Sequence, residues 1–288
     1  MGMKLPVFRR KTSKKLKKAI HVEESAKLCF IKTKIPGFDR MFERGIPCGS
    51  STIVSGGPGT GKTLLCLHLL YHEALEGGDC VYLSLEEAPS RLKRHMERFN
   101  FDISEVSRDK LSIFLKAGKG RLVLKRLEPI AIARSVEALL EKASGELPVD
   151  LGVLLDLIPP TFNPRMVVLD SISAMETAFS GRVEQYRIYI EQLFRYFEKL
   201  GTTSFLITET EEAPVRFSKT GVEEFLADGI IALYNYRAGR ERARGIEIVK
   251  MRGEWHSTKL AEMIITKRGL VVLPNSKKTN NLIKRQGG

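Results

Sequence analysis

Between residues 55 and 64 the chain reads Ser55-Gly56-Gly57-Pro58-Gly59-Thr60-Gly61-Lys62-Thr63-Leu64. This run fills every position of the phosphate-loop pattern G-x-x-x-x-G-K-[ST]. An apolar β-branched run, 52–54, precedes it, and a segment with helical character, 64–75, follows it. A coincidental glycine-rich turn would explain the loop but not these flanks. The sequence therefore predicts a strand, a phosphate-binding loop and a helix in succession.

The chemistry of this loop follows from its residue types. Glycines allow the backbone to fold closely around an anion, so amide groups point inward and the positive end of the new helix adds to their attraction. We expect Lys62 to reach the β- and γ-phosphates of a nucleotide and the Thr63 hydroxyl to bind Mg²⁺. The predicted nucleotide-binding residues are Gly59, Thr60, Gly61, Lys62, Thr63 and Leu64.

Length and composition indicate a globular protein: 288 residues, 43% of them hydrophobic, can bury a sizeable core. The four cysteines show no C-x-x-C pairing, which argues against a zinc site or a disulfide scaffold and favours buried thiols in a reducing compartment. No apolar run approaches the ~20 residues that span a bilayer, and no signal-peptide core is present. We expect a cytoplasmic protein.

The net charge of +13 is concentrated at the two ends of the chain. Residues 1–20 contain eight Lys or Arg and no acid, and residues 274–288 contain four and no acid. The remaining chain is close to neutral. We expect a basic tail over 1–21, a nucleotide-binding domain over 22–273 and a second basic tail over 274–288. Solvated arms are the simplest interpretation of the tails, and contact with a nucleic acid or another polyanion is the alternative.

Strand and helix patterns alternate along the central part of the chain. Strands are predicted at 80–85, 111–115, 165–170 and 203–208, and helices at 64–75, 89–99, 128–143 and 183–200, with an ordered loop or insertion at 145–164. Beyond residue 228, four short β runs at 229–236, 245–252, 260–266 and 270–273 alternate with turns. These patterns predict an α/β fold with a central, mostly parallel twisted sheet flanked by helices and an antiparallel C-terminal extension.

Carboxylates stand at the ends of two predicted strands, where α/β sheets bind their ligands. Asp170 lies about a hundred residues after the phosphate loop and is expected to hold Mg²⁺. Because Ser171 and not Glu follows it, the water-activating base must come from elsewhere. Glu86 and Glu87 close the strand at 80–85 and are the predicted catalytic carboxylates, with Glu86 the preferred base. The alternative is that they only favour the start of the next helix.

Five motifs together resemble the KaiC-like branch of RecA-type ATPases, which are P-loop NTPases. They are Pro36-Gly37-Phe38-Asp39, the loop from Gly56 to Leu64, Leu85-Glu86-Glu87-Ala88-Pro89, Leu169-Asp170-Ser171 and Lys250-Met251-Arg252-Gly253. The resemblance covers about residues 30–275, room for one ATPase unit. It implies a homo-oligomer, commonly a hexameric ring, that binds ATP with Mg²⁺ between subunits, and it gives no ground for a clock role.

The resemblance also implies roles for residues that pattern alone does not single out. Lys250 and Arg252 match the pair that reaches a neighbour's γ-phosphate, and His256 and Thr266 match further contacts to the nucleotide across the interface. Lys267 stands where the family has an acid, and Glu254 where it has a small hydroxyl residue. Without the resemblance, Lys250 and Arg252 alternate on a strand face and an exposed basic edge explains them.

Two further groups of polar residues lie at or near the ends of predicted strands. Thr208 and Glu209, which end the strand after Asp170, are candidates for sensing the γ-phosphate. The cluster Arg237, Arg240, Arg242 and Arg244 falls on a predicted hairpin turn, for which solvent exposure is a simpler explanation than binding.

Two biological roles fit such an ATPase. In the first it acts on nucleic acid in repair or recombination, with basic segments that follow phosphates. In the second it is a regulatory or scaffold ATPase whose nucleotide state controls a protein partner. Phe8 is the only aromatic residue in the first twenty, so the N-terminal tail lacks a platform for base stacking, which favours the second role.

Overall fold

The structure is a computed structural model that describes residues 29–134, 157–179, 182–211, 216–218, 220–238 and 241–276. The basic tail 1–21 lies outside these ranges, as do the C-terminal tail beyond residue 276 and residues 135–156. The predicted helix 128–143 and insertion 145–164 are therefore described only in part. Residues 129–134 are helical.

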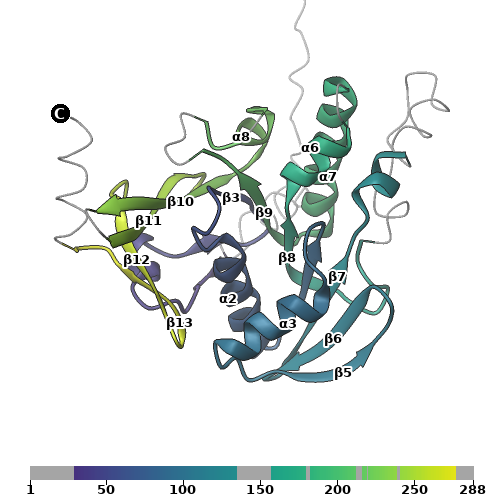
Figure 1. Cartoon of the computed structure of the whole chain (residues 1–288), viewed down its shortest axis with the longest axis horizontal. Helices are drawn as coiled ribbons and strands as arrows, with labels where there is room; N and C mark the ends of the chain where they lie inside the picture. The colour runs from purple at the N-terminus through teal and green to yellow at the C-terminus, as the bar shows by residue number, and fades with distance from the viewer. Residues whose placement is uncertain are drawn as a thin grey trace, which may run out of the picture.

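A sheet of eleven strands forms the centre of the described chain. In spatial order the strands are β13 (Gly269–Leu273), β12 (Ala261–Thr266), β11 (Glu241–Met251), β10 (Gly229–Ala238), β3 (Ser51–Gly56), β9 (Thr203–Glu209), β8 (Pro164–Asp170), β4 (Asp79–Ser84), β7 (Gly120–Arg126), β6 (Ser112–Ala117) and β5 (Ser104–Arg108). Figure 1 shows β10 to β13 at one end of the molecule and β5 to β7 at the other.

The middle of the sheet, from β10 to β7, is parallel, and both of its ends are antiparallel. This confirms the predicted α/β fold with its antiparallel C-terminal extension. The second antiparallel extension, β7-β6-β5, was not fully predicted. Only one of its strands was recognised, because β5 is exposed at every position and β7 carries basic residues among its apolar ones.

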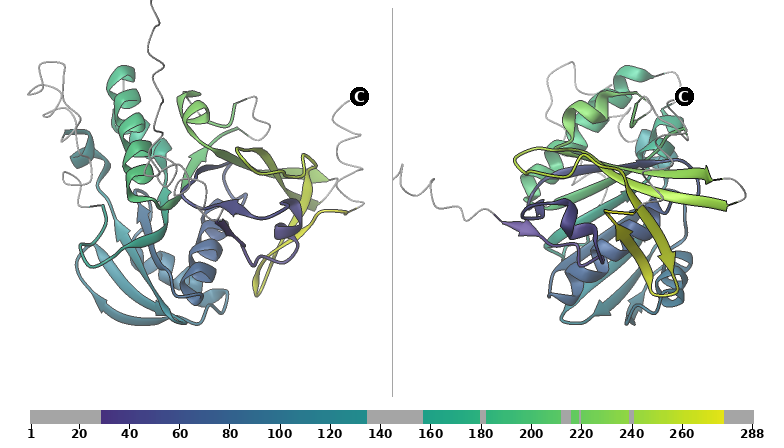
Figure 2. Two further views of the ribbon diagram at one scale, coloured as in Figure 1. Left: turned by 180° about the vertical axis from the view of Figure 1, so that it is seen from behind. Right: turned by 90° about the vertical axis from the view of Figure 1, so that its left-hand side faces the viewer.

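Helices cover both faces of the sheet. Helix α2 (Lys62–Leu75), helix α3 (Pro89–Arg98) and the short 3-10 helix η1 (Phe38–Met41) contribute to one hydrophobic cluster. Helices α6 (Ile172–Ala178) and α7 (Val183–Leu200) contribute to the other, which also contacts the C-terminal end of α8 (Val222–Leu226). The right-hand view of Figure 2 shows the two sets on opposite sides of the sheet.

Apolar patterning explains the principal elements. Strands β3, β4 and β8 are buried almost throughout, as strands in a doubly covered parallel sheet must be. Helix α7 buries Tyr186, Tyr189, Ile190, Leu193 and Phe197, the spacing of one helix face, and its bounds match the prediction. No helix in the described part of the chain is long and apolar enough to cross a membrane.

Two cysteines near the start of the described chain form a disulfide, and the prediction that all four are thiols is wrong for these two. Strands β1 (Phe30–Ile31) and β2 (Ile46–Pro47) pair antiparallel, which places Cys29 opposite Cys48 with Cα atoms 5.3 Å apart. Their spacing in the sequence does not reveal this pairing. Cys66 and Cys80 are free and buried, as predicted.

The parallel strands bring four distant residues to one edge of the sheet. Gly56 at the end of β3 pairs with Glu209 at the end of β9, and Ser84 at the end of β4 pairs with Asp170 at the end of β8. The phosphate loop and the strand-end carboxylates therefore share this edge.

Candidate active site

The phosphate loop connects β3 to α2 through glycines in left-handed conformations. Gly59 has φ +72° and Gly61 has φ +107°, values that other residues rarely adopt. A side chain at Gly61 would begin 3.5 Å from the Met263 side chain and 3.6 Å from that of Ile265, so β12 runs beside the loop. Thr60 Oγ1 donates to the Gly57 carbonyl at 2.8 Å. The loop is a backbone cradle at a helix N-terminus, which suits a phosphate group.

Lys62 lies within this cradle. Its Nζ donates hydrogen bonds to the carbonyl oxygens of Gly56 at 2.8 Å and Gly57 at 3.1 Å. Burial lowers the pKa of Lys62, and the nearby charges of Glu209, Asp170 and Glu86 partly offset this effect. The lysine is thus a cation next to the loop with three carboxylates around it.

Thr63 and Asp170 form the oxygen pair suited to a cation. Thr63 Oγ1 donates to Asp170 Oδ2 at 3.1 Å, and the Tyr82 hydroxyl donates to the same oxygen. Burial raises the pKa of Asp170 to about 6, against the opposing effect of the Tyr82 hydrogen bond. A hydroxyl and a carboxylate are hard oxygen ligands of the kind Mg²⁺ takes beside phosphates, so these residues fit that ion.

The two adjacent glutamates point to different partners. Glu86 is exposed, and its Oε1 accepts a hydrogen bond from Ser171 Oγ, directly after Asp170. Glu87 Oε2 lies 3.7 Å from Arg91 Nε and 3.9 Å from His95 Nδ1, both on α3. Glu86 therefore stands on the side of the Lys62–Asp170 cluster, and Glu87 on the side of α3.

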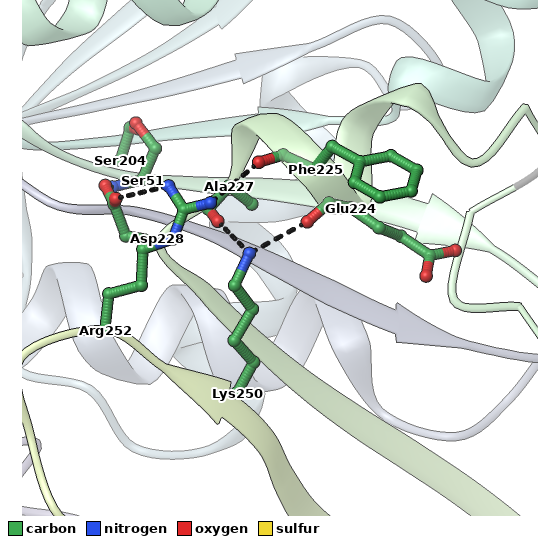
Figure 3. A network of polar contacts seen from close by, with 8 residues as sticks. All are labelled: Ser51, Ser204, Glu224, Phe225, Ala227, Asp228, Lys250 and Arg252. Atoms are coloured by element: carbon green, nitrogen blue, oxygen red, sulfur yellow. Dashed lines mark hydrogen bonds and ion pairs between the residues drawn. The ribbon is translucent and has the colours of Figure 1, made fainter.

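Lys250 and Arg252 lie away from the phosphate loop of their own chain. Figure 3 shows both side chains held by the C-terminal end of α8: Lys250 Nζ donates to Glu224 O at 2.9 Å and Ala227 O at 2.6 Å, and Arg252 Nη2 donates to Phe225 O at 2.9 Å. Arg252 is also 3.5 Å from Asp228 Oδ1.

Backbone hydrogen bonds determine how far Arg252 lies from the phosphate loop of its own chain. Arg252 N donates to Asp228 O, and Asp228 N donates to Ser51 O, each at 2.8 Å. Arg252 is thus level with the first residue of β3, whereas the phosphate loop begins at its last residue, Gly56. Five residues of strand correspond to about 17 Å. The structure does not bring Arg252 to the phosphate loop of the same chain.

His256 and Thr266 also make contacts of their own. His256 follows β11 and forms an isolated bridge with Phe42. Thr266 Oγ1 donates to Gly269 O at 2.9 Å and accepts from Arg268 N at 3.1 Å, within the turn between β12 and β13. These contacts neither support nor oppose a role at a neighbouring nucleotide.

The structure adds residues that the sequence patterns did not reveal. A pocket of about 440 Å³ beside the phosphate loop is lined by Gly59, Gly61, Lys62, Thr63, Leu64, Leu67, His95, Arg98 and Phe99. The last three lie on or just after α3 and were not predicted, nor was the contact of Tyr82 with Asp170. Arg244, interpreted as a solvated turn residue, donates from Nε to Gly59 O at 3.1 Å and so contacts the loop.

Known proteins resemble this chain over most of its length. The family model of the KaiC ATPase matches residues 31–277. The chain belongs to the KaiC family of ATPases. The predicted resemblance is therefore confirmed. The phosphate loop is the part of the chain that carries the nucleotide-binding motif.

Relatives of this KaiC-family chain differ in length. It is 30% identical over 250 residues to the circadian clock protein KaiC3 of Synechocystis sp., of which it spans 46%. It is 32% identical over 251 residues to a UPF0273 protein of Aeropyrum pernix, of which it spans 94%. The crystal structure of a KaiC-like protein from Pyrococcus horikoshii OT3 matches with a TM-score of 0.61 and 27% identity, covering 86% of this chain and 100% of that one.

Proposed function

We propose that this KaiC-family chain hydrolyses ATP with Mg²⁺ at the interfaces of a homo-oligomeric ring, with six subunits as the expected number. The observation that carries the proposal is the convergence of Lys62, Thr63, Asp170 and Glu86 at one sheet edge. In this proposal residues 22–273 form the ATPase domain, and the basic segments 1–21 and 274–288 lie outside it.

Each residue has a part in hydrolysis. The amides from Gly59 to Leu64 and the Lys62 ammonium bind the phosphates, and Thr63 and Asp170 hold the Mg²⁺ directly or through water. Mg²⁺, when bound, neutralises charge on the β- and γ-phosphate oxygens. Glu86 orients or deprotonates the attacking water, since its carboxylate is exposed beside the cluster, and Glu87 orients α3 and its pocket residues.

The position of the two cations supports the proposed ring. Arg252 lies level with Ser51, and Lys250, through its partner Ile230, lies level with Ile53. Both positions precede the phosphate loop, so we expect these cations to serve a neighbour's γ-phosphate and not their own. Arginine fingers supplied in this way contribute ~10³–10⁵ in rate. His256 and Thr266 would contact the same neighbouring nucleotide.

Mixing two defective variants tests this proposal. Phosphate release per subunit should rise with protein concentration as rings form, and the Arg252→Ala variant should bind ATP but hydrolyse it slowly at any concentration. Mixing Arg252→Ala with Glu86→Gln subunits should restore activity, because an interface then combines Glu86 of the first with Arg252 of the second. Lack of rescue in rings shown by native mass spectrometry to be mixed would reject the trans arrangement.

We further propose a regulatory or scaffold role toward a protein partner. The scarcity of aromatic residues in the basic tails supports it, because single-strand binding usually uses base stacking. ATPase activity measured with single-stranded DNA over a salt series should stay constant. Strong stimulation that weakens as salt rises would favour a nucleic-acid role instead.

A further inference from the structure

The loop that follows Arg252 is attached along its length to the segment 41–45. Ser257 N donates to Met41 O at 2.8 Å, and Glu43 N donates to Trp255 O at 3.2 Å. Phe42 and His256 form a bridge between these hydrogen bonds. The residues that follow Arg252 are therefore held in place by segment 41–45, which precedes the phosphate loop.

Arg44 and Glu254 join the two segments through an ion pair. Arg44 Nε donates to Glu254 Oε2 at 2.9 Å, the Arg44 backbone N–H donates to Glu254 Oε1, and Arg44 Nη2 donates to Gly253 O at 3.2 Å. The Glu254 side chain is fully buried. Burial opposes its charge, but the hydrogen bonds from Arg44 prevail and lower the pKa of Glu254. Without the Arg44 side chain, the buried Glu254 carboxylate would keep backbone N–H donors but lose the cation that compensates its charge.

Arg44 is itself held from the other side. Its guanidinium carbon lies 4.2 Å from the centre of the Phe30 ring, a cation–π distance. Phe30 belongs to β1, and the Cys29–Cys48 disulfide joins the two strands beside it. A side chain on Gly45 would begin 2.5 Å from Ile31 O, so the backbone after Arg44 is pressed against the same strand. The guanidinium therefore has a fixed platform.

The residue between Arg252 and Glu254 explains why such a contact is needed. Gly253 has φ +72°, and no heavy atom lies within 4 Å of where its side chain would start. The turn around it is closed by a long hydrogen bond, from Glu254 N to Met251 O at 3.5 Å, so a further constraint would steady its conformation. The Arg44 contacts to the Gly253 carbonyl and to Glu254 supply that constraint.

We propose that Arg44 is a positioning residue for the Arg252 finger: by holding Gly253 and Glu254, it sets the direction in which Arg252 is presented to the neighbouring subunit. This inference rests on the proposed function, because it gives Arg44 an effect only where Arg252 acts in trans. A misplacement of about 1 Å can cost 10²-fold in rate, so loss of the contact should affect catalysis more than binding.

The test uses the full chain with Arg44→Ala, Arg44→Lys and Glu254→Gln. We expect Arg44→Ala to lower kcat about 10- to 10²-fold. The KM for ATP should stay within about twofold of wild type, and the mass of the ring should be unchanged. Arg44→Lys keeps the positive charge but lacks the planar guanidinium with its paired donors, so its kcat should lie between those of wild type and Arg44→Ala. Glu254→Gln should also lower kcat, and it serves as the test if Arg44→Ala does not fold. Arg40→Ala, at an exposed arginine four residues earlier, should leave kcat unchanged.

Mixed rings separate this inference from the proposed function. Arg44→Ala subunits mixed with Glu86→Gln subunits should regain activity. In the mixed ring, the Glu86→Gln subunit supplies an intact Arg44 and Arg252, and its Arg44→Ala neighbour supplies an intact Glu86. If Arg252→Ala is rescued by Glu86→Gln but Arg44→Ala is not, the inference alone is overturned. A normal kcat in Arg44→Ala and Glu254→Gln while Arg252→Ala is defective would also overturn the inference alone. A fully active Arg252→Ala variant would instead overturn the trans finger, and the inference with it.

Discussion

Thr63 Oγ1 donates a hydrogen bond to Asp170 Oδ2 at 3.1 Å, which joins the phosphate loop to the end of β8 across 107 positions of sequence. In a nucleotide complex the two oxygens would turn to the Mg²⁺ ion. In the proposed function, these two oxygens hold the cation.

Replacing Asp170 by Asn should raise the Mg²⁺ concentration needed for half-maximal ATPase activity by about tenfold or more, because the carboxylate charge is lost. The measurement is a Mg²⁺ titration of phosphate release at fixed ATP. Asp102→Asn, at an exposed aspartate, is the control. An unchanged Mg²⁺ requirement in Asp170→Asn would contradict the assignment.

Lys62→Ala should abolish measurable ATP binding and leave the subunit folded. The variant would lose the charge-assisted hydrogen bonds expected from Lys62 to phosphate, which corresponds to a Kd at least about 10²-fold weaker. Among the described residues, Lys62 donates hydrogen bonds to the Gly56 and Gly57 carbonyls, neither of which belongs to a buried side chain. Binding of a fluorescent ATP analogue, compared with Lys116→Ala on β6, measures the effect. Normal affinity in a folded Lys62→Ala protein would refute the phosphate-loop role.

Glu86→Gln should retain ATP but slow hydrolysis by about 10²-fold or more, the scale of a lost acid–base group. Glu87→Gln should be less impaired, since its carboxylate faces Arg91 and His95 on α3. Single-turnover phosphate release in preassembled rings compares the two. An inactive Glu87→Gln with a normal Glu86→Gln would reverse the assignment of the base.

His68 should make the folded state less stable in acid. Burial lowers its pKa from 6.5 to about 4, and its Nε2 accepts a hydrogen bond from Leu270 N at 3.2 Å. Between pH 6.5 and 4 the unfolded chain takes up a proton that the folded chain does not, so stability falls as pH falls through this window. The free energy of unfolding should drop by about 2 kcal/mol from pH 7 to pH 5 through this group.

Urea denaturation at both pH values measures this drop. The His68→Gln variant keeps an acceptor for Leu270 N without the titrating ring, so its loss between pH 7 and pH 5 should be smaller by a similar amount. An equal loss in both proteins would show that His68 does not titrate in this way.

The Cys29–Cys48 disulfide should be detectable chemically. Under denaturing, non-reducing conditions a thiol reagent should label two cysteines per chain, Cys66 and Cys80, and reduction should expose all four. Replacing both Cys29 and Cys48 by Ser should lower stability by about 3 kcal/mol, the usual effect of opening a loop of this length. Labelling of four thiols before reduction would contradict the bond.

Local sequence pattern was enough to predict much of this molecule. The phosphate loop, its flanking strand and helix, and helix α7 depend on contiguous residues whose spacing and conformational preferences are visible in the chain. The carboxyl ends of buried parallel strands meet at one edge, so Asp170 and Glu86 could be assigned to the same site.

The tertiary structure decided which residues of distant segments meet. Sequence pattern did not reveal the pairing of Cys29 with Cys48, the bond from Tyr82 to Asp170 or the anchoring of Glu254 by Arg44. These contacts depend on strand order and register and on burial shared between segments up to 210 positions apart. A residue's neighbours in the chain largely determine its local conformation. Its tertiary contacts form only when distant segments pack into one core, because the free energy of burying apolar surface depends on the whole fold and not on a single segment.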